Sequence, residues 1–292
     1  MTRWKLTETD VLLSSTVHPA RRRRLGSFAI LAILVAATSL VLVIGPTAGL
    51  GNSHPAASPA ANPGRSQPAA TPSASRVLLQ AGTTAGAQPG GWPGAAYWHS
   101  ISSYRQGTGP VLRRESWAGH RTIGVLKDPR LSNGAVPLQD GRFAGFSWDQ
   151  LYALPTDSLT LERQLRATSL DGGRDHDAEL FAIVGDLLHE SPAPPALRKA
   201  LWEIAARMPR VTLVGAVRDS SGRSGVAVMR GDLGYILDTE NGHLLEEFRG
   251  TSVPRPGAPG GANWHSTNLA QGPADSAPVT TPTRSRPTPA KG

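Results

Sequence analysis

The chain has 292 residues, with 30 Lys+Arg against 22 Asp+Glu and a formal net charge of +8. It contains no cysteine, which excludes a thiolate nucleophile, a cysteine-ligated zinc site and a disulfide framework. Glycine (32) and proline (25) make up about a fifth of the residues, so we expect much of the chain to lie outside a packed core.

An apolar segment near the N-terminus is long enough to cross a bilayer. Residues 25–44 are uncharged and, as a helix, would span about 30 Å, the thickness of the hydrocarbon layer. Four cationic residues come directly before it: Arg21, Arg22, Arg23 and Arg24. Because positive charge stays on the cytoplasmic side, these arginines predict a single-pass protein of the cell membrane with residues 1–24 in the cytoplasm and the C-terminal domain outside it.

Two export signals are the alternatives for this segment. A cleaved signal peptide has an apolar region of about 7–15 residues and a small-x-small site; this run is longer, and only Thr47-Ala48-Gly49 is permissive. A twin-arginine signal at Arg23-Arg24 is a weak interpretation, since any arginine cluster contains the pair. In each case the rest of the chain lies outside the cytoplasm.

Two segments have the composition of disordered chain. Residues 45–94 are mostly Ala, Pro, Ser, Gly and Thr, and residues 251–292 are similar. Such segments bury too little apolar surface to offset the entropy lost on ordering. We therefore predict a disordered linker over 45–94 and a disordered tail over 251–292.

The positive charge lies in the flanks rather than in the remaining part of the chain. Residues 95–250 contain 18 Lys+Arg and 19 Asp+Glu, so this part is nearly neutral. It lacks the basic surface that nucleic-acid binding requires, and we expect no nucleic-acid partner.

Strand patterns come first in the predicted extracytoplasmic domain, residues 95–250. Alternating aromatic and β-branched residues predict strands over 96–104, 111–118 and 121–127. Residues 128–150 are rich in glycine and proline and show no clear pattern.

Helix patterns follow. Side-chain oxygens at Thr156-Asp157-Ser158 predict a helix start, and an apolar stripe predicts a second helix over Asp175–Glu190. Pro194-Pro195 predicts the start of a third helix, which Pro209 ends.

Strand patterns then return to the end of the domain. The predicted strands lie over 211–217, 225–229, 233–237 and 243–248, with turn residues between them. The order of strands, helices and strands predicts an α+β fold, an antiparallel sheet with helices packed on one face.

Several stretches of residues 96–248 are distinctive: LPTDSLTLERQLRA, AELFAIVGDLLHESPAPPALRKALWEIAARMPRV, VGAVRDSSGRSGVAV and YILDTENGHLLEE, with YWHS and ESW in the first strands. Together they resemble an uncharacterised actinobacterial family of single-pass membrane proteins known only by a locus-tag name. The resemblance covers about residues 96–248. Two parts of this chain are shorter than in the family: the cytoplasmic part and the region between the early strands and Leu154. It implies the same fold and topology and no particular activity.

No motif predicts a catalytic residue, a cofactor site or a metal site. Gly222-Arg223-Ser224-Gly225 lacks the spacing of a nucleophile elbow, and no phosphate-binding loop is present. Glu246 and Glu247 are neighbours on a strand and point to opposite faces, so they cannot share a site. Asp175-His176-Asp177 is explained as the acidic first turn of a helix. We therefore expect no enzyme activity.

Large aromatic residues form the one candidate ligand site. If the early strands make one curved sheet, Trp98, Tyr104, Trp117 and Trp148 could line an apolar pocket for a lipid chain. The alternative is ordinary packing of large side chains in the core.

Two functions of different classes remain open. The first is a membrane-anchored extracytoplasmic interaction or sensory module without catalytic activity, which meets a protein, cell-wall or lipid partner. The second is a carrier of a lipid or other hydrophobic ligand in a half-open sheet. A zinc-type anti-sigma factor is excluded, because only about 24 cysteine-free residues precede the predicted span.

Overall fold

The computed structural model describes residues 73–131, 134–139, 141–168, 175–255 and 262–279. The predicted cytoplasmic segment, the predicted membrane span and the first part of the predicted linker lie outside these ranges. Of the helices within them, none is both long and apolar enough to cross a membrane.

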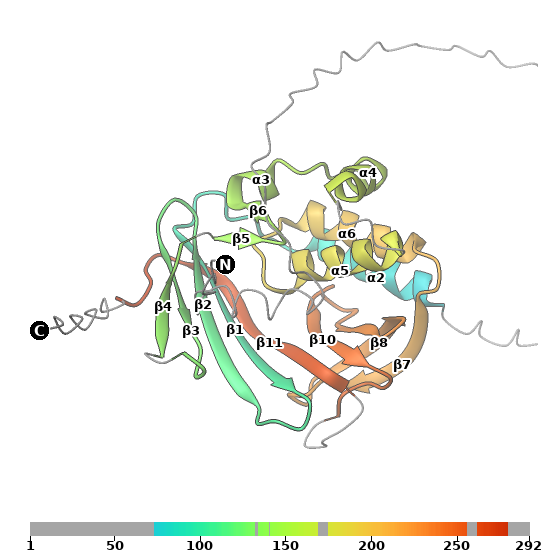
Figure 1. The fold of residues 1–292 in the computed structure, drawn as a ribbon. Helices are drawn as coiled ribbons and strands as arrows, with labels where there is room; N and C mark the ends of the chain where they lie inside the picture. The colour runs from blue at the N-terminus through green and yellow to red at the C-terminus, as the bar shows by residue number, and fades with distance from the viewer. Residues whose placement is uncertain (1–72, 132–133, 140, 169–174, 256–261, 280–292) are drawn as a thin grey trace, which may run out of the picture. The chain divides into compact units, whose positions relative to one another are not determined.

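A nine-stranded antiparallel sheet forms one layer of the molecule (Figure 1). Its strand order is β4-β3-β2-β1-β11-β10-β9-β8-β7, and a separate small pair is formed by β5 and β6. The strands are β1 (Tyr97–Gln106), β2 (Leu112–Gly119), β3 (Gly124–Lys127), β4 (Ala135–Leu138), β5 (Arg142–Phe143), β6 (Phe146–Ser147), β7 (Thr212–Arg218), β8 (Ser224–Arg230), β9 (Leu233–Leu237), β10 (Leu244–Gly250) and β11 (Ala262–Ala274).

Helices cover one face of this sheet, as Figure 1 shows for α2, α5 and α6. The helices are α2 (Ala74–Ala87), α3 (Trp148–Tyr152), α4 (Ser158–Thr168), α5 (His176–His189) and α6 (Pro195–Arg207). The predicted α+β class, an antiparallel sheet with helices on one face, is therefore confirmed.

The helices begin where the sequence places their caps. The Asp157 carboxylate accepts a hydrogen bond from the backbone N–H of Thr160 at 2.9 Å, and Asp175 accepts one from Ala178 at 3.0 Å. Pro195 occupies the first turn of α6. The three predicted helices are thus present as α4, α5 and α6.

The predicted disordered linker contains a helix, and disorder is the wrong prediction for Ala74–Ala87. Leu78 and Ala81 of α2 are fully buried. A Cβ at Gly82 would lie only 3.2 Å from the Lys199 carbonyl oxygen, so small residues bring α2 close to α6. Composition missed this helix because it has few large apolar residues, and both the burial of Leu78 and the close approach at Gly82 depend on packing against α6.

The predicted disordered tail contains the central strand of the sheet, so disorder is also wrong for Ala262–Ala274. Strand β11 pairs with β1 on one side and with β10 on the other. Its buried side chains include Ser266, Thr267 and Asn268, which are polar. The strand is held by backbone hydrogen bonds to two neighbours, a contribution that a hydropathy pattern does not report.

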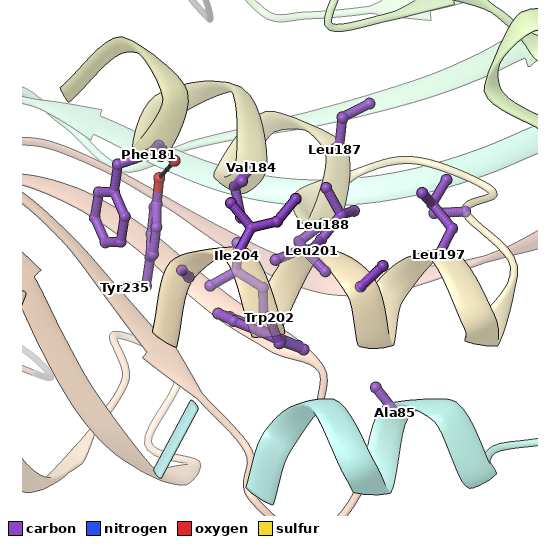
Figure 2. Packing of buried hydrophobic residues seen from close by; sticks show 14 of the residues in the cluster. Ala85, Phe181, Val184, Leu187, Leu188, Leu197, Leu201, Trp202, Ile204 and Tyr235 are labelled. Atoms are coloured by element: carbon purple, nitrogen blue, oxygen red, sulfur yellow. Dashed lines mark hydrogen bonds between the residues drawn. The ribbon is translucent and has the colours of Figure 1, made fainter. Parts of the chain in front are cut away.

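The core lies between the sheet and helices α5 and α6 (Figure 2). Phe181, Leu188, Leu201 and Ile204 are fully buried in it. The Tyr235 hydroxyl of β9 donates to the Phe181 carbonyl oxygen at 2.6 Å, and the two rings stack with centroids 4.5 Å apart. This contact seats α5 directly on the sheet.

We expect the Gly185→Ala substitution to destabilise the fold by about 2 kcal/mol, because a Cβ at Gly185 would overlap the Tyr235 ring and hydroxyl. Denaturant unfolding measures the change. Gly86→Ala in α2 is the matched control, since its added Cβ meets only the flexible Lys199 side chain and alanine favours helix. Equal midpoints for the two variants would contradict the close approach of α5 and β9.

Candidate functional site

The four aromatic residues predicted to line a pocket lie on different sides of the sheet. Trp98 and Tyr104 share the helix-facing side of β1 and are 2% and 7% exposed. Trp117 pairs with His99 and therefore faces the opposite side, where the two rings stack at 4.3 Å. Trp148 lies in α3, stacked on His120. These side chains are not brought together into one pocket.

A small cavity does lie beside Trp98, between the end of α2 and the start of α6. Its lining includes Trp92, Gln271 and Arg198, and its volume is about 60 Å³. Sites for drug-sized ligands occupy several hundred Å³. This cavity is too small for a lipid chain and does not favour the carrier function.

A group of ionisable side chains, which we call the α5 charged cluster, lies where the end of α5 meets the sheet. It consists of Arg114 of β2, Asp186, His189 and Glu190 in and after α5, and Glu247 and Arg249 of β10. The Arg114 guanidinium donates to both carboxylate oxygens of Glu190, at 3.0 and 3.1 Å. Both bonds come from one guanidinium nitrogen, Nη2, so this is a charge-assisted ion pair rather than a fork of two parallel N–H bonds.

The carboxyl groups of this cluster are shifted in opposite directions. Burial would raise the pKa of Glu190, but Arg114 and His189 outweigh it and lower that pKa to about 2. Burial, reinforced by Glu190 and opposed by Arg249, raises the pKa of Asp186 to about 7. Burial and the neighbouring Asp186 raise the pKa of Glu247 well above its ordinary value. Near neutral pH, Asp186 and Glu247 are therefore not both fully charged.

A serine, a histidine and a glutamate meet on the other face of the sheet without forming a catalytic triad. Ser220 Oγ donates to Glu246 Oε1 at 2.8 Å and lies 3.3 Å from His265 Nδ1. The same ring nitrogen lies 3.1 Å from Glu246 Oε1, whereas a triad uses opposite nitrogens for its hydroxyl and carboxylate. The contacts tie the β7–β8 loop to β10 and β11.

Glu246 and Glu247 serve different faces of β10, as their adjacency in a strand predicts. Glu246 binds Ser220, whereas Glu247 belongs to the α5 charged cluster. Asp175 caps α5 and accepts a hydrogen bond from Arg230 at 2.8 Å. Within the described ranges, no group of three or more His, Asp or Glu side chains is arranged to hold a metal ion.

The two ends of the sheet differ in what they offer to another chain. Edge strand β4 is four residues long and contains Pro137, which has no N–H to donate. Edge strand β7 is seven residues long, and its sequence from Val211 to Val217 carries no charge. Val214 in its middle is 47% exposed. Among the described residues β7 pairs with β8 alone, which leaves a row of backbone groups open to a partner.

Sequence reasoning predicted β7 as a strand but missed that it is an edge. It also missed the α5 charged cluster, whose members come from β2, α5 and β10. The one local indication was that Glu246 and Glu247, as neighbours in a strand, point to opposite faces of the sheet.

Comparison with known proteins gives structural neighbours only. No protein-family model matches the chain, and no curated protein matches it. A complex of Pseudomonas aeruginosa MucA and MucB is 15% identical, with a TM-score of 0.28 over 70% of this chain and 58% of that chain. MucB in complex with MucA(peri) gives the same identity and TM-score over 69% and 56%, and MucB alone gives 14% and 0.28 over 70% and 60%. The chain thus spans less than two thirds of these structures.

We expect Asp186→Asn to stabilise the protein at pH 8 by about 1–3 kcal/mol and to have little effect near pH 4. A carboxyl whose folded pKa is raised favours folding below its unfolded pKa, and this contribution is lost as pH rises toward 7. Asparagine mimics the protonated form at every pH. Unfolding free energies measured from pH 4 to 8 test this.

The matched control is Glu190→Gln, which has the opposite sign. The folded pKa of Glu190 is lowered, so its charge stabilises the fold above pH 4.5 and the variant loses stability at neutral pH. If the difference in unfolding free energy between Asp186→Asn and the parent chain did not change from pH 4 to pH 8, the placement of Asp186 in the cluster would be contradicted.

Proposed function

We propose that the chain is a membrane-anchored, extracytoplasmic module without catalytic activity that binds a protein partner. The observation that carries the proposal is the open edge of β7, an uncharged strand with Val214 exposed at its centre. Adding a strand to an exposed sheet edge is a general mode of peptide recognition, in which the backbone supplies the hydrogen bonds.

The anchor and the location in this proposal rest on the N-terminal sequence. Residues 25–44 form the span, and Arg21 to Arg24 hold the preceding segment in the cytoplasm. The absence of cysteine and the neutral charge of residues 95–250 are compatible with a domain outside the cytoplasm whose partner is not a nucleic acid.

The polar groups of the described part support a non-catalytic role. Ser220, His265 and Glu246 are the described group that most resembles a catalytic triad. The Ser220 hydroxyl donates a hydrogen bond to Glu246, and both Ser220 and Glu246 contact the same nitrogen of His265, Nδ1. A hydroxyl held in this way stabilises a loop, and its histidine is not oriented by a carboxylate on the opposite ring nitrogen as the base of a triad is. Within the α5 charged cluster, burial raises the pKa of Asp186 to about 7, which supports a sensory element within the same module.

The partner can be tested by photocrosslinking in intact cells. We expect a benzophenone amino acid placed at position 214 of the full chain to form an adduct with a second, different protein. The same group at Leu159 is the control, because this residue is 60% exposed and lies on α4, which packs against α5 and α6. Identical adducts from both positions, or none from position 214, would overturn the proposal.

The topology can be tested separately, because the chain has no cysteine of its own. Ser252, exposed after β10, is expected to react as cysteine with an impermeant maleimide in intact cells. A cysteine replacing Ser15, in the predicted cytoplasmic segment, should react only after lysis. The reverse pattern would show the opposite orientation.

A further inference from the structure

We propose that the β7 edge binds an extended segment of a different protein. The centre of that segment is uncharged, and each of its two ends carries an acidic residue. The β7 edge does not pair with a second copy of this chain. This inference rests on the proposed function and names the partner's chemistry.

The strand is framed by cations. Between Arg210 and Arg218 every residue is uncharged, and most are apolar or β-branched. The Arg210 side chain is 73% exposed, and Arg218 is also exposed. A bound strand would therefore run along an apolar centre and meet a positive charge at each end.

Arg210 forms one exposed ion pair within its own fold. Its guanidinium lies 3.2 Å from Asp175, whose side chain is 41% exposed and which also binds the buried Arg230 at 2.8 Å. Arg230 lies 3.8 Å from Asp177 as well. Because an exposed ion pair contributes little and is screened by solvent, the Arg210 side chain is available to a further carboxylate from a partner.

The backbone at Arg210 adds a second, independent observation. Its φ is +64°, a left-handed conformation that glycine adopts freely and that costs an arginine about 1 kcal/mol. A strained residue with an exposed charged side chain is typical of a functional position.

At the C-terminal end of β7, the Arg218 side chain forms its described hydrogen bond with a neutral group. Its guanidinium donates to the Gly222 carbonyl oxygen at 2.7 Å. The adjacent Asp219 is buried and bound by Arg223 at 2.7 Å. Among the described residues, no carboxylate forms an ion pair with Arg218.

The same charges oppose pairing with a second copy. Two copies related by a two-fold axis would pair β7 antiparallel. In a pair centred on Val214, Arg210 of each copy would lie opposite Arg218 of the other, at both ends. Like charges opposite each other destabilise a strand pair, and other registers would shorten the ladder.

The bulge in β7 further restricts what can bind. The register with β8 shifts between Leu213 and Gly215, where Gly215 has a φ of +118°. Bulges twist an edge away from indiscriminate pairing. The positive charges of Arg210 and Arg218 would then attract a segment that has acidic residues at its ends.

Peptide binding to the full detergent-solubilised chain tests the inference. The probes are two fluorescent peptides, Glu-Val-Thr-Val-Thr-Val-Glu and Lys-Val-Thr-Val-Thr-Val-Lys, followed by fluorescence anisotropy. We expect the acidic peptide to bind about tenfold tighter or more at low salt, and the difference to shrink at high salt. Equal affinities, or a preference for the basic peptide, would overturn the inference.

Charge reversal provides the matched variants. Arg218→Glu, whose only described polar partner is a carbonyl, should reduce the preference for the acidic peptide severalfold without changing thermal stability. Adding Arg210→Glu should abolish or reverse the preference. Arg163→Glu, an exposed arginine of α4, is the control and should leave both affinities unchanged.

The failure of this inference can be told apart from failure of the proposed function. A heterologous adduct from position 214 without any charge preference would overturn the acidic-end chemistry and leave the function standing. Adducts of twice the chain's mass, in cells and in purified protein, would show self-pairing and overturn the exclusion of a second copy.

Discussion

The pairing of β11 is the constraint on which the rest of the structure depends. It joins the sheet half made by β1–β4 to the half made by β7–β10, because its backbone bonds β1 on one side and β10 on the other. Its polar residues reach the helices as well, since the Asn268 side-chain amide donates to the His189 carbonyl oxygen at 2.7 Å. Because β11 lies between β1 and β10, neither of these is an edge, and the described nine-stranded sheet ends at β4 and β7. The insertion of β11 thus leaves the candidate binding edge, β7, at one end of a single continuous sheet.

Some of the contacts between helix α5 and the sheet stabilise the fold, and others destabilise it. Gly185 allows the Tyr235 ring to pack closely against α5, and Arg114 holds Glu190 by an ion pair from one guanidinium nitrogen. Asp186 and Glu247 oppose these contacts as they ionise, because both are desolvated and lie near other carboxylates. The contact of α5 with the sheet therefore loses stability as pH rises and Asp186 and Glu247 ionise.

Much of the fold followed from local pattern, whereas the candidate site did not. Asp157, Asp175 and Pro195 begin helices because their chemistry satisfies or avoids the free N–H groups of a first turn, a rule that needs no tertiary information. Trp117 was grouped with Trp98 because both lie in predicted strands, but only the register with β1 decides which face each side chain occupies. In the same way, Arg114 and Glu190 are distant in the chain, and no spacing rule connects them.

Composition is enough to predict the nearly neutral charge of residues 95–250, and local pattern is enough to predict the helix starts and most of the strands. Three features depend on long-range packing and pairing: α2 is a helix, β11 is the central strand and β7 is an edge. The physical reason is common to all three. Small residues pack when another backbone comes close, a polar strand is stable when both its sides are paired, and an edge exists only where pairing stops.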